Sequence, residues 1–154
     1  MKKILFVCLG NICRSPIAQG IAQNYVDENG LDIKIDSCGT GDFHIGENPC
    51  EHSQTVASEN GIDISKHKAR QITKEDLQSF DLIVGLDDKN IIELESIGCP
   101  SSKLKKLGKY GCEDADIPDP YFFDGFEGFE KVYDMIEICT INLIDEQINN
   151  KRGK

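Results

Sequence analysis

Runs of apolar residues alternate with amphipathic stretches along the 154-residue chain. Short apolar or alternating runs predict strands at 3–8, 33–38 and 82–86, and a brief, lysine-rich run predicts a fourth at 103–107. Apolar spacing of three and four and capping residues predict helices at 16–28, from Asn48 to Asn60, from Thr73, from Asp87 or Asp88, and from Phe126 to about Ile148. Strands that alternate with helices indicate an α/β fold with a parallel sheet and helices on both faces, a three-layer sandwich.

Several helix ends are marked by residues that suit them. Ser15 and Pro16 predict the cap and first residue of one helix, and Asn48 with Glu51 three residues later predicts another start. Thr73 with Asp76 has the same capping pattern. The chain is therefore expected to form a single domain over residues 1–148, followed by a solvated tail at 149–154.

Composition and charge limit the partners, the location and the cofactors that the protein is expected to have. The net charge of −10 argues against nucleic acid and against an anionic membrane surface as partners, and no apolar run approaches the ~20 residues of a membrane helix. Seven cysteines, an odd number without a CxxC pair, predict reduced thiols and a cytoplasmic location. The histidines at positions 44, 52 and 67 lack metal-ligand spacing, so neither a metal nor another cofactor is expected.

The most informative motif is the segment from Cys8 to Ser15, between the first predicted strand and the first predicted helix. A turn at a helix N-terminus points backbone N–H groups at an anion, which favours both a thiolate at Cys8 and a bound phosphate. Arg14 would hold two phosphoryl oxygens through its planar guanidinium. The motif predicts Cys8 as a nucleophile, with a phosphate bound by the backbone of Leu9, Gly10, Asn11, Ile12, Cys13 and Arg14.

Transfer of a phosphoryl group also needs a proton for the leaving oxygen. The acidic run from Glu113 to Asp119 offers four carboxyl groups, and spacing does not choose between them. The Ser15 hydroxyl is placed to donate to the Cys8 thiolate when that thiolate leaves the phosphorus.

The chain resembles the low-molecular-weight protein tyrosine phosphatases in three motifs: Cys8 to Ser15, His67 to Thr73, and Asp119 to Phe122. The resemblance covers nearly the whole chain and implies a four-stranded parallel sheet of order 2-1-3-4. It implies hydrolysis of protein phosphotyrosine and aryl phosphates through a phosphocysteine, with Asp119 as general acid and base, and with phosphate as a product inhibitor. It also implies that Asn11 and His67 support the loop.

Aromatic side chains are candidates for a slot that grips a phenyl ring, namely Phe43, Tyr121 and Phe122. The family often has tryptophan or tyrosine where Phe43 stands, and eukaryotic members have a second tyrosine where Phe122 stands. These departures affect the expected substrate preference.

Three other activities fit part of the pattern. A thioredoxin-coupled arsenate reductase needs further cysteines after the third strand, where this chain has Cys99 alone. A protein-arginine phosphatase of the same family has threonine in place of Ile12. A phosphocarrier of a sugar phosphotransferase system would use Cys8 and leave Arg14 and Asp119 without a role.

Cys13 lies in the same turn as Cys8. The two are expected to come within the roughly 4.4 to 6.8 Å between Cα atoms that a disulfide needs. Because an exposed thiolate reacts with peroxide, the sequence predicts a reversible Cys8–Cys13 disulfide.

Overall fold

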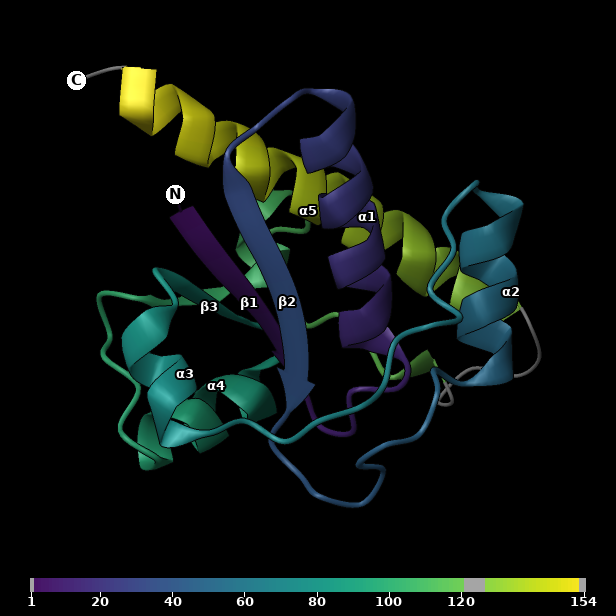
Figure 1. The fold of residues 1–154 in the computed structure, drawn as a ribbon, viewed down its shortest axis with the longest axis horizontal. Coiled ribbons are helices and arrows are strands. Elements are labelled where there is room, and N and C mark those ends of the chain that lie inside the picture. The colour runs from purple at the N-terminus through teal and green to yellow at the C-terminus, as the bar shows by residue number, and fades with distance from the viewer. Residues whose placement is uncertain (1, 121–126, 153–154) are drawn as a thin grey trace.

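The computed structural model describes residues 2–120 and 127–152, which form one α/β unit (Figure 1). The elements follow one another as β1 (Lys2–Cys8), α1 (Arg14–Glu28), β2 (Ile33–Gly39), α2 (Glu51–Glu59), α3 (Lys74–Ser79), β3 (Leu82–Gly85), α4 (Asp88–Ser96), β4 (Leu104–Lys106), the 3₁₀ helix η1 (Leu107–Tyr110) and α5 (Glu127–Arg152). Every predicted strand and helix is present, and the strand bounds agree with the prediction to within one residue at each end.

The four strands form a parallel sheet in the order β2-β1-β3-β4, so the expected order is confirmed. β1 is central and buried on both faces, as an apolar run in a parallel sheet should be. Ile4 and Phe6 pack toward α1 and α5, whereas Leu5 and Val7 pack toward α3 and α4. Because each such side chain contributes about 1.5–3 kcal/mol when fully buried, β1 ties both layers of helices to the sheet.

The helices lie on the two faces of the sheet, which confirms the three-layer arrangement. Figure 1 shows α1, α2 and α5 on one face and α3 and α4 on the other. The larger apolar cluster fills the first side and the smaller one, which includes Leu77, Phe80 and Leu94, fills the second. The carboxyl end of β1 therefore opens into a loop held between two packed layers.

Three predicted helix ends are wrong. α1 begins at Arg14 with Cys13 as its N-cap, because the buried Ser15 hydroxyl bonds to Cys8 and Asn11 instead of capping the helix. α2 begins at Glu51 with residue 50 as its N-cap, two residues after the predicted cap. α5 continues to Arg152, so residues 149–152 extend the helix beyond the predicted end near Ile148.

Two other helix starts follow the prediction. Thr73 and Asp76 form a reciprocal capping box at α3, and Asp87 rather than Asp88 caps α4 with Asn90 as its partner. Among residues 2–120 and 127–152, no helix has the length and apolar character needed to cross a membrane.

Candidate active site

The loop between β1 and α1 is held in place by hydrogen bonds from neighbouring segments to its carbonyl groups. The carbonyl oxygens of Cys8 and Leu9 accept hydrogen bonds of 2.9 Å from the backbone N–H groups at positions 40 and 41, just after β2. Those of Ile12 and Cys13 accept bonds of 2.8 and 3.2 Å from the start of α2. The N–H of Asn11 points to the centre of the loop, where it donates to the Cys8 sulfur, and N–H groups directed in this way favour an anion there.

The thiol of Cys8 lies at the bottom of this loop and is 2 % exposed. Its sulfur accepts a hydrogen bond from the backbone N–H of Asn11 at 3.3 Å and lies 3.0 Å from the hydroxyl oxygen of Ser15. The Ser15 oxygen also accepts a bond from the Asn11 amide nitrogen, and when Cys8 is a thiolate the Ser15 hydroxyl is the donor in its contact with the sulfur. Both contacts stabilise a thiolate, as predicted for Ser15.

Asn11 is the structural centre of the loop, and its φ of 59° provides the turn. Its side-chain oxygen accepts bonds of 3.0 Å from His67 Nε2 and from the backbone N–H of Arg70. Its amide nitrogen donates to Ser15 at 2.8 Å and to Ser37 at 3.0 Å. The contact between Asn11 and His67 that the family resemblance implied is therefore present.

The left-handed backbone of the loop belongs to Asn11, and Gly10 has a different role. At Gly10 a Cβ atom would meet Cδ2 of His44 at 3.0 Å, so the missing side chain makes room for that ring. Gly39 is also required, since a Cβ there would lie 2.6 Å from the Leu9 carbonyl oxygen. Both glycines allow other chain segments to pack closely against the loop.

Arg14 is 6 % exposed and fixed from outside the loop. Its Nη1 donates to Oδ2 of Asp87 at 2.6 Å and to the carbonyl of Ile117 at 3.0 Å. Burial lowers the pKa of Arg14, but the charges of Cys8 and Asp87 outweigh it and leave the pKa above its ordinary value. The guanidinium thus stays charged, and within the described residues both of its hydrogen bonds use Nη1, which directs the remaining N–H groups elsewhere.

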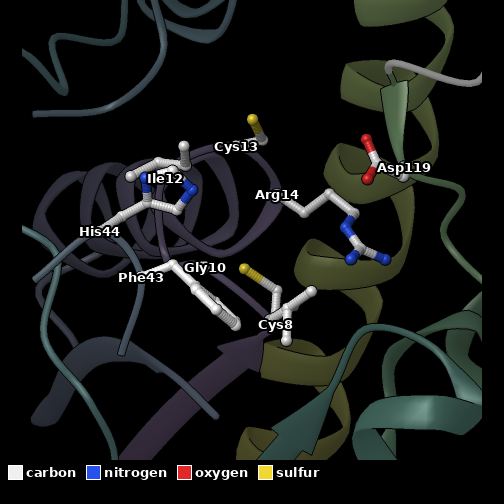
Figure 2. Close-up of a pocket in the computed structure, with 9 residues that line it drawn as sticks. Cys8, Gly10, Ile12, Cys13, Arg14, Phe43, His44 and Asp119 are labelled. Carbon is white, nitrogen blue, oxygen red and sulfur yellow. The ribbon is translucent and has the colours of Figure 1, made fainter. Parts of the chain in front are cut away.

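A pocket of about 150 Å³ lies above the Cys8 sulfur (Figure 2). Its lining brings together most of the residues predicted from the sequence: Cys8, Leu9, Gly10, Ile12, Cys13, Arg14, Phe43, His44 and Asp119. Figure 2 shows Phe43 and His44 across the pocket from Asp119. Phe43 is 74 % exposed, so its ring is accessible at the pocket mouth. Tyr121 and Phe122 lie outside the described residues.

Among the carboxyl groups of the acidic run, the structure separates Asp119 from Asp116. Asp119 is half-buried and lines the pocket with Cys8 and Arg14. Asp116 instead accepts bonds from Lys106 Nζ at 2.9 Å and from the backbone N–H of Asp88 at 3.0 Å. These contacts outweigh burial and hold the pKa of Asp116 below its ordinary value.

Cys13 has a neighbour that the motif does not indicate. Its sulfur lies 2.9 Å from the sulfur of Cys50 at the start of α2, and Figure 2 shows it pointing away from Cys8. The hydrogen bond to Cys50, followed by burial, raises the pKa of Cys13. The chain contains no disulfide, and the Cys8–Cys13 pairing remains a prediction.

Comparisons with known proteins agree with this geometry. Residues 3–154 match the family model described as low molecular weight phosphotyrosine protein phosphatase. The chain belongs to this family. It is 43 % identical over 134 residues to the low molecular weight protein-tyrosine-phosphatase YfkJ of Bacillus subtilis, which covers 82 % of this chain and 85 % of the relative.

Solved structures of the phosphatase family superpose over almost the whole chain. A protein tyrosine phosphatase from Entamoeba histolytica has a TM-score of 0.90 at 32 % identity, covering 98 % of this chain and 99 % of that one. DARP, described as a drosophila arginine phosphatase, has a TM-score of 0.87 at 34 % identity, covering 96 % and 98 %. The enzyme therefore has the fold of this phosphatase family.

The sequence did not predict a role in the site for four residues that the structure places there: Ser37, His44, Cys50 and Asp87. Asp87 had a usable signal, since it lies two residues after the end of β3, whose carboxyl end is at the same edge of the sheet as that of β1. The other three lack any local pattern that separates them from ordinary loop and strand residues.

Proposed function

We propose that the enzyme hydrolyses phosphotyrosine in proteins or peptides, and aryl phosphates, in two steps through a phosphocysteine at Cys8. The observation that carries the proposal is the convergence of Cys8, Arg14 and Asp119 on one pocket. These three side chains supply the nucleophile, the charge that neutralises the phosphoryl oxygens, and the acid for the leaving oxygen.

In the first step the Cys8 thiolate attacks phosphorus, and the bond from phosphorus to the tyrosine oxygen breaks. The backbone N–H groups of the loop and the charged Arg14 stabilise the negative equatorial oxygens. Asp119 donates its proton to the departing phenolate. The slot is lined by Phe43, whose exposed ring is suited to contact the phenyl group of the substrate.

In the second step water attacks phosphorus, and Asp119 removes a proton from it as a general base. The Cys8 thiolate leaves, stabilised by the Ser15 hydroxyl and the Asn11 N–H. Inorganic phosphate is released and, because it fits the same loop, acts as a product inhibitor. A cytoplasmic location is part of this proposal, supported by seven cysteines that carry thiols.

One alternative has a specific observation in its favour, which is the likeness to DARP, described as an arginine phosphatase. Against it stands Ile12, whose apolar side chain lines the pocket where the arginine phosphatases have threonine. A thioredoxin-coupled arsenate reductase is less well supported, because Cys99 packs in the apolar cluster that includes Leu5 and Val7.

Steady-state turnover of phosphotyrosine, phosphoserine and phosphoarginine peptides, with arsenate reduction measured in parallel, tests the proposal. We expect phosphotyrosine to be preferred and Cys8→Ser to have no turnover while it still binds phosphate or vanadate. Preference for phosphoarginine, or arsenate reduction dependent on thioredoxin, would replace the proposed substrate. Substantial hydrolysis by Cys8→Ser would remove the proposed nucleophile.

A further inference from the structure

The contact between Cys13 and Cys50 places a third thiol beside the two in the loop. The Cys13 and Cys50 sulfur atoms lie 2.9 Å apart, whereas a disulfide needs about 2.05 Å, so an approach of less than an ångström would join them. Both residues are half-buried, and each is the N-cap of a helix, Cys13 of α1 and Cys50 of α2.

The surrounding hydrogen bonds fix this contact. The backbone N–H of Cys50 donates to the carbonyl of Ile12 at 2.8 Å. The Ser53 hydroxyl donates to the carbonyl of Cys13 at 3.2 Å, and its oxygen also lies 3.0 Å from the Cys50 sulfur. The start of α2 is thus bound to the loop on both sides of the thiol pair, which preserves their register while the side chains turn.

Cys13 also lies within reach of Cys8. Both line the pocket, and charge on Cys8 contributes to the raised pKa of Cys13. A turn about the Cα–Cβ bond of Cys13 moves its sulfur between the side that faces Cys50 and the side that faces Cys8. Cys13 is therefore positioned to exchange between two partners.

We propose that Cys8, Cys13 and Cys50 form a relay in which oxidation by hydrogen peroxide ends as a Cys13–Cys50 disulfide, with Cys8 returned as a thiolate. The inference rests on the proposed role of Cys8 as the reactive thiolate of the enzyme. It differs from the Cys8–Cys13 pair predicted from the sequence by making that pair an intermediate.

The steps balance without another oxidant. The Cys8 thiolate attacks one peroxide oxygen, the O–O bond breaks, and Cys8 becomes a sulfenic acid as hydroxide leaves. The Cys13 thiol attacks the Cys8 sulfur, the S–O bond breaks, and the hydroxyl leaves with the Cys13 proton as water, which gives the Cys8–Cys13 disulfide. Cys50 loses its proton to the hydroxide of the first step, forming the second water, and attacks the Cys13 sulfur, and Cys8 departs as a thiolate. In sum, two thiols and one peroxide give one disulfide and two waters.

Two features set the direction of the relay. Cys13 keeps its proton at neutral pH because its contact with Cys50 and its burial raise its pKa, so peroxide reacts first at Cys8. The last step releases Cys8 into a site that stabilises its negative charge, with the Asn11 N–H at 3.3 Å and the Ser15 hydroxyl at 3.0 Å. A thiolate stabilised in this way is the better leaving group of the two sulfurs.

Peptide mapping by mass spectrometry tests the relay on the full chain. The protein is treated with about one equivalent of hydrogen peroxide, the remaining thiols are alkylated, and the disulfides are mapped without reduction. We expect Cys13–Cys50 as the main linkage in the wild type, with most activity retained or regained before any reductant is added. Cys50→Ser should accumulate Cys8–Cys13 and stay inactive until dithiothreitol is added.

Two further variants separate the route from direct oxidation of the pair. Cys8→Ser should form the Cys13–Cys50 bond roughly tenfold more slowly or worse, because it lacks the thiol that peroxide oxidises first and the raised pKa of Cys13 keeps that thiol protonated. Cys112→Ser is the matched control. It alters the second close thiol pair, in which Cys139 and Cys112 sulfurs lie 3.2 Å apart, and should behave as the wild type in both readouts.

Cys8–Cys13 as the end state in the wild type, identical maps for Cys50→Ser and the wild type, or bond formation in Cys8→Ser at the wild-type rate would each overturn the relay. These outcomes are distinct from failure of the proposed function. That failure would be seen as absence of phosphotyrosine hydrolysis before peroxide is added, whereas the maps report bonds between sulfurs whatever the substrate.

Discussion

Arg14 Nη1 donates a 2.6 Å hydrogen bond to Oδ2 of Asp87, while Oδ1 of the same carboxylate accepts the N–H of Asn90 at 2.8 Å and caps α4. One side chain just after β3 thus orients the Arg14 guanidinium and starts a helix. The arginine of the loop is positioned by a neighbouring strand as well as by its own turn, which reduces the freedom it would lose on binding phosphate.

Asp87→Asn separates these two roles. Asparagine is as good an N-cap as aspartate, so the free energy of unfolding should change little. It cannot form the charged bond to Arg14, and we expect kcat/KM for an aryl phosphate to fall by about tenfold, since charge-assisted bonds are roughly twice as strong as neutral ones. Kinetics and chemical denaturation measure the two effects.

Asp88→Asn is the control for that variant, because Asp88 lies in the first turn of α4 and its exposed carboxylate pairs with Lys106 at 2.9 Å. We expect its kcat/KM to match the wild type. An equal fall in both variants would assign the effect to the helix and not to Arg14.

Arg14→Lys should lose most activity although the positive charge is kept. An ammonium cannot reproduce the planar pair of donors that two phosphoryl oxygens accept, nor hold Asp87 and the Ile117 carbonyl at the same time. Steady-state kinetics and the inhibition constant of phosphate measure the loss. Wild-type values for both would show that the loop binds phosphate without the guanidinium.

Asp119→Asn tests the general acid through the leaving group. A phenol has a pKa of about 10, so phenolate departs poorly at neutral pH without a proton donor, and the variant should slow phosphotyrosine peptides by ~10² to 10⁴. In kcat/KM, which reports attack by Cys8 and not the later hydrolysis of the intermediate, an aryl phosphate with a much more acidic phenol should be affected far less. The kcat/KM values of both substrates give the ratio.

Asp114→Asn and Asp116→Asn provide controls in the same acidic run. Asp116 is bonded to Lys106 and to the start of α4, so its loss should leave both substrates close to wild type in turnover. Equal losses on both leaving groups in Asp119→Asn would indicate a structural role, and a larger loss that depends on the leaving group in Asp116→Asn would move the acid to that residue.

His67 should make the stability of the fold depend on pH. Burial outweighs the bond to Asn11 and lowers the pKa of His67 below its ordinary 6.5. As pH falls through 6.5, the unfolded chain takes up a proton that the folded enzyme does not, so the free energy of unfolding decreases until the lower folded pKa is passed.

Urea denaturation at about pH 7.5 and about pH 5.5 measures this effect, since the interval spans the pKa of a free histidine. The wild type should lose more stability over the interval than His67→Gln, which keeps an amide donor for the Asn11 oxygen. The same loss in both proteins would mean that other groups carry the pH dependence.

The parts of the site that follow one another in the chain could be predicted from sequence. The loop from Cys8 to Ser15 can be recognised because its strand, turn and helix are adjacent in the sequence, and only the exact start of α1 was wrong. Contacts between distant segments could not, because spacing carries no information on which loops meet. The long segment after β2 brings Cys50 to Cys13. Asp116 differs from Asp119 because it is bonded to Lys106, a residue of the distant strand β4.

Detection of the covalent intermediate tests the account most directly. The Asp119→Asn enzyme, which should retain attack by Cys8 on an activated aryl phosphate but hydrolyse the intermediate slowly, is mixed with that substrate and quenched in acid. Mass spectrometry of the peptide that contains Cys8 should find one phosphate on the Cys8 sulfur, and none after Cys8→Ser is introduced. Turnover of the substrate with phosphate on another residue, or with burst-phase release of phenol from the Cys8→Ser protein, would contradict a phosphocysteine at Cys8.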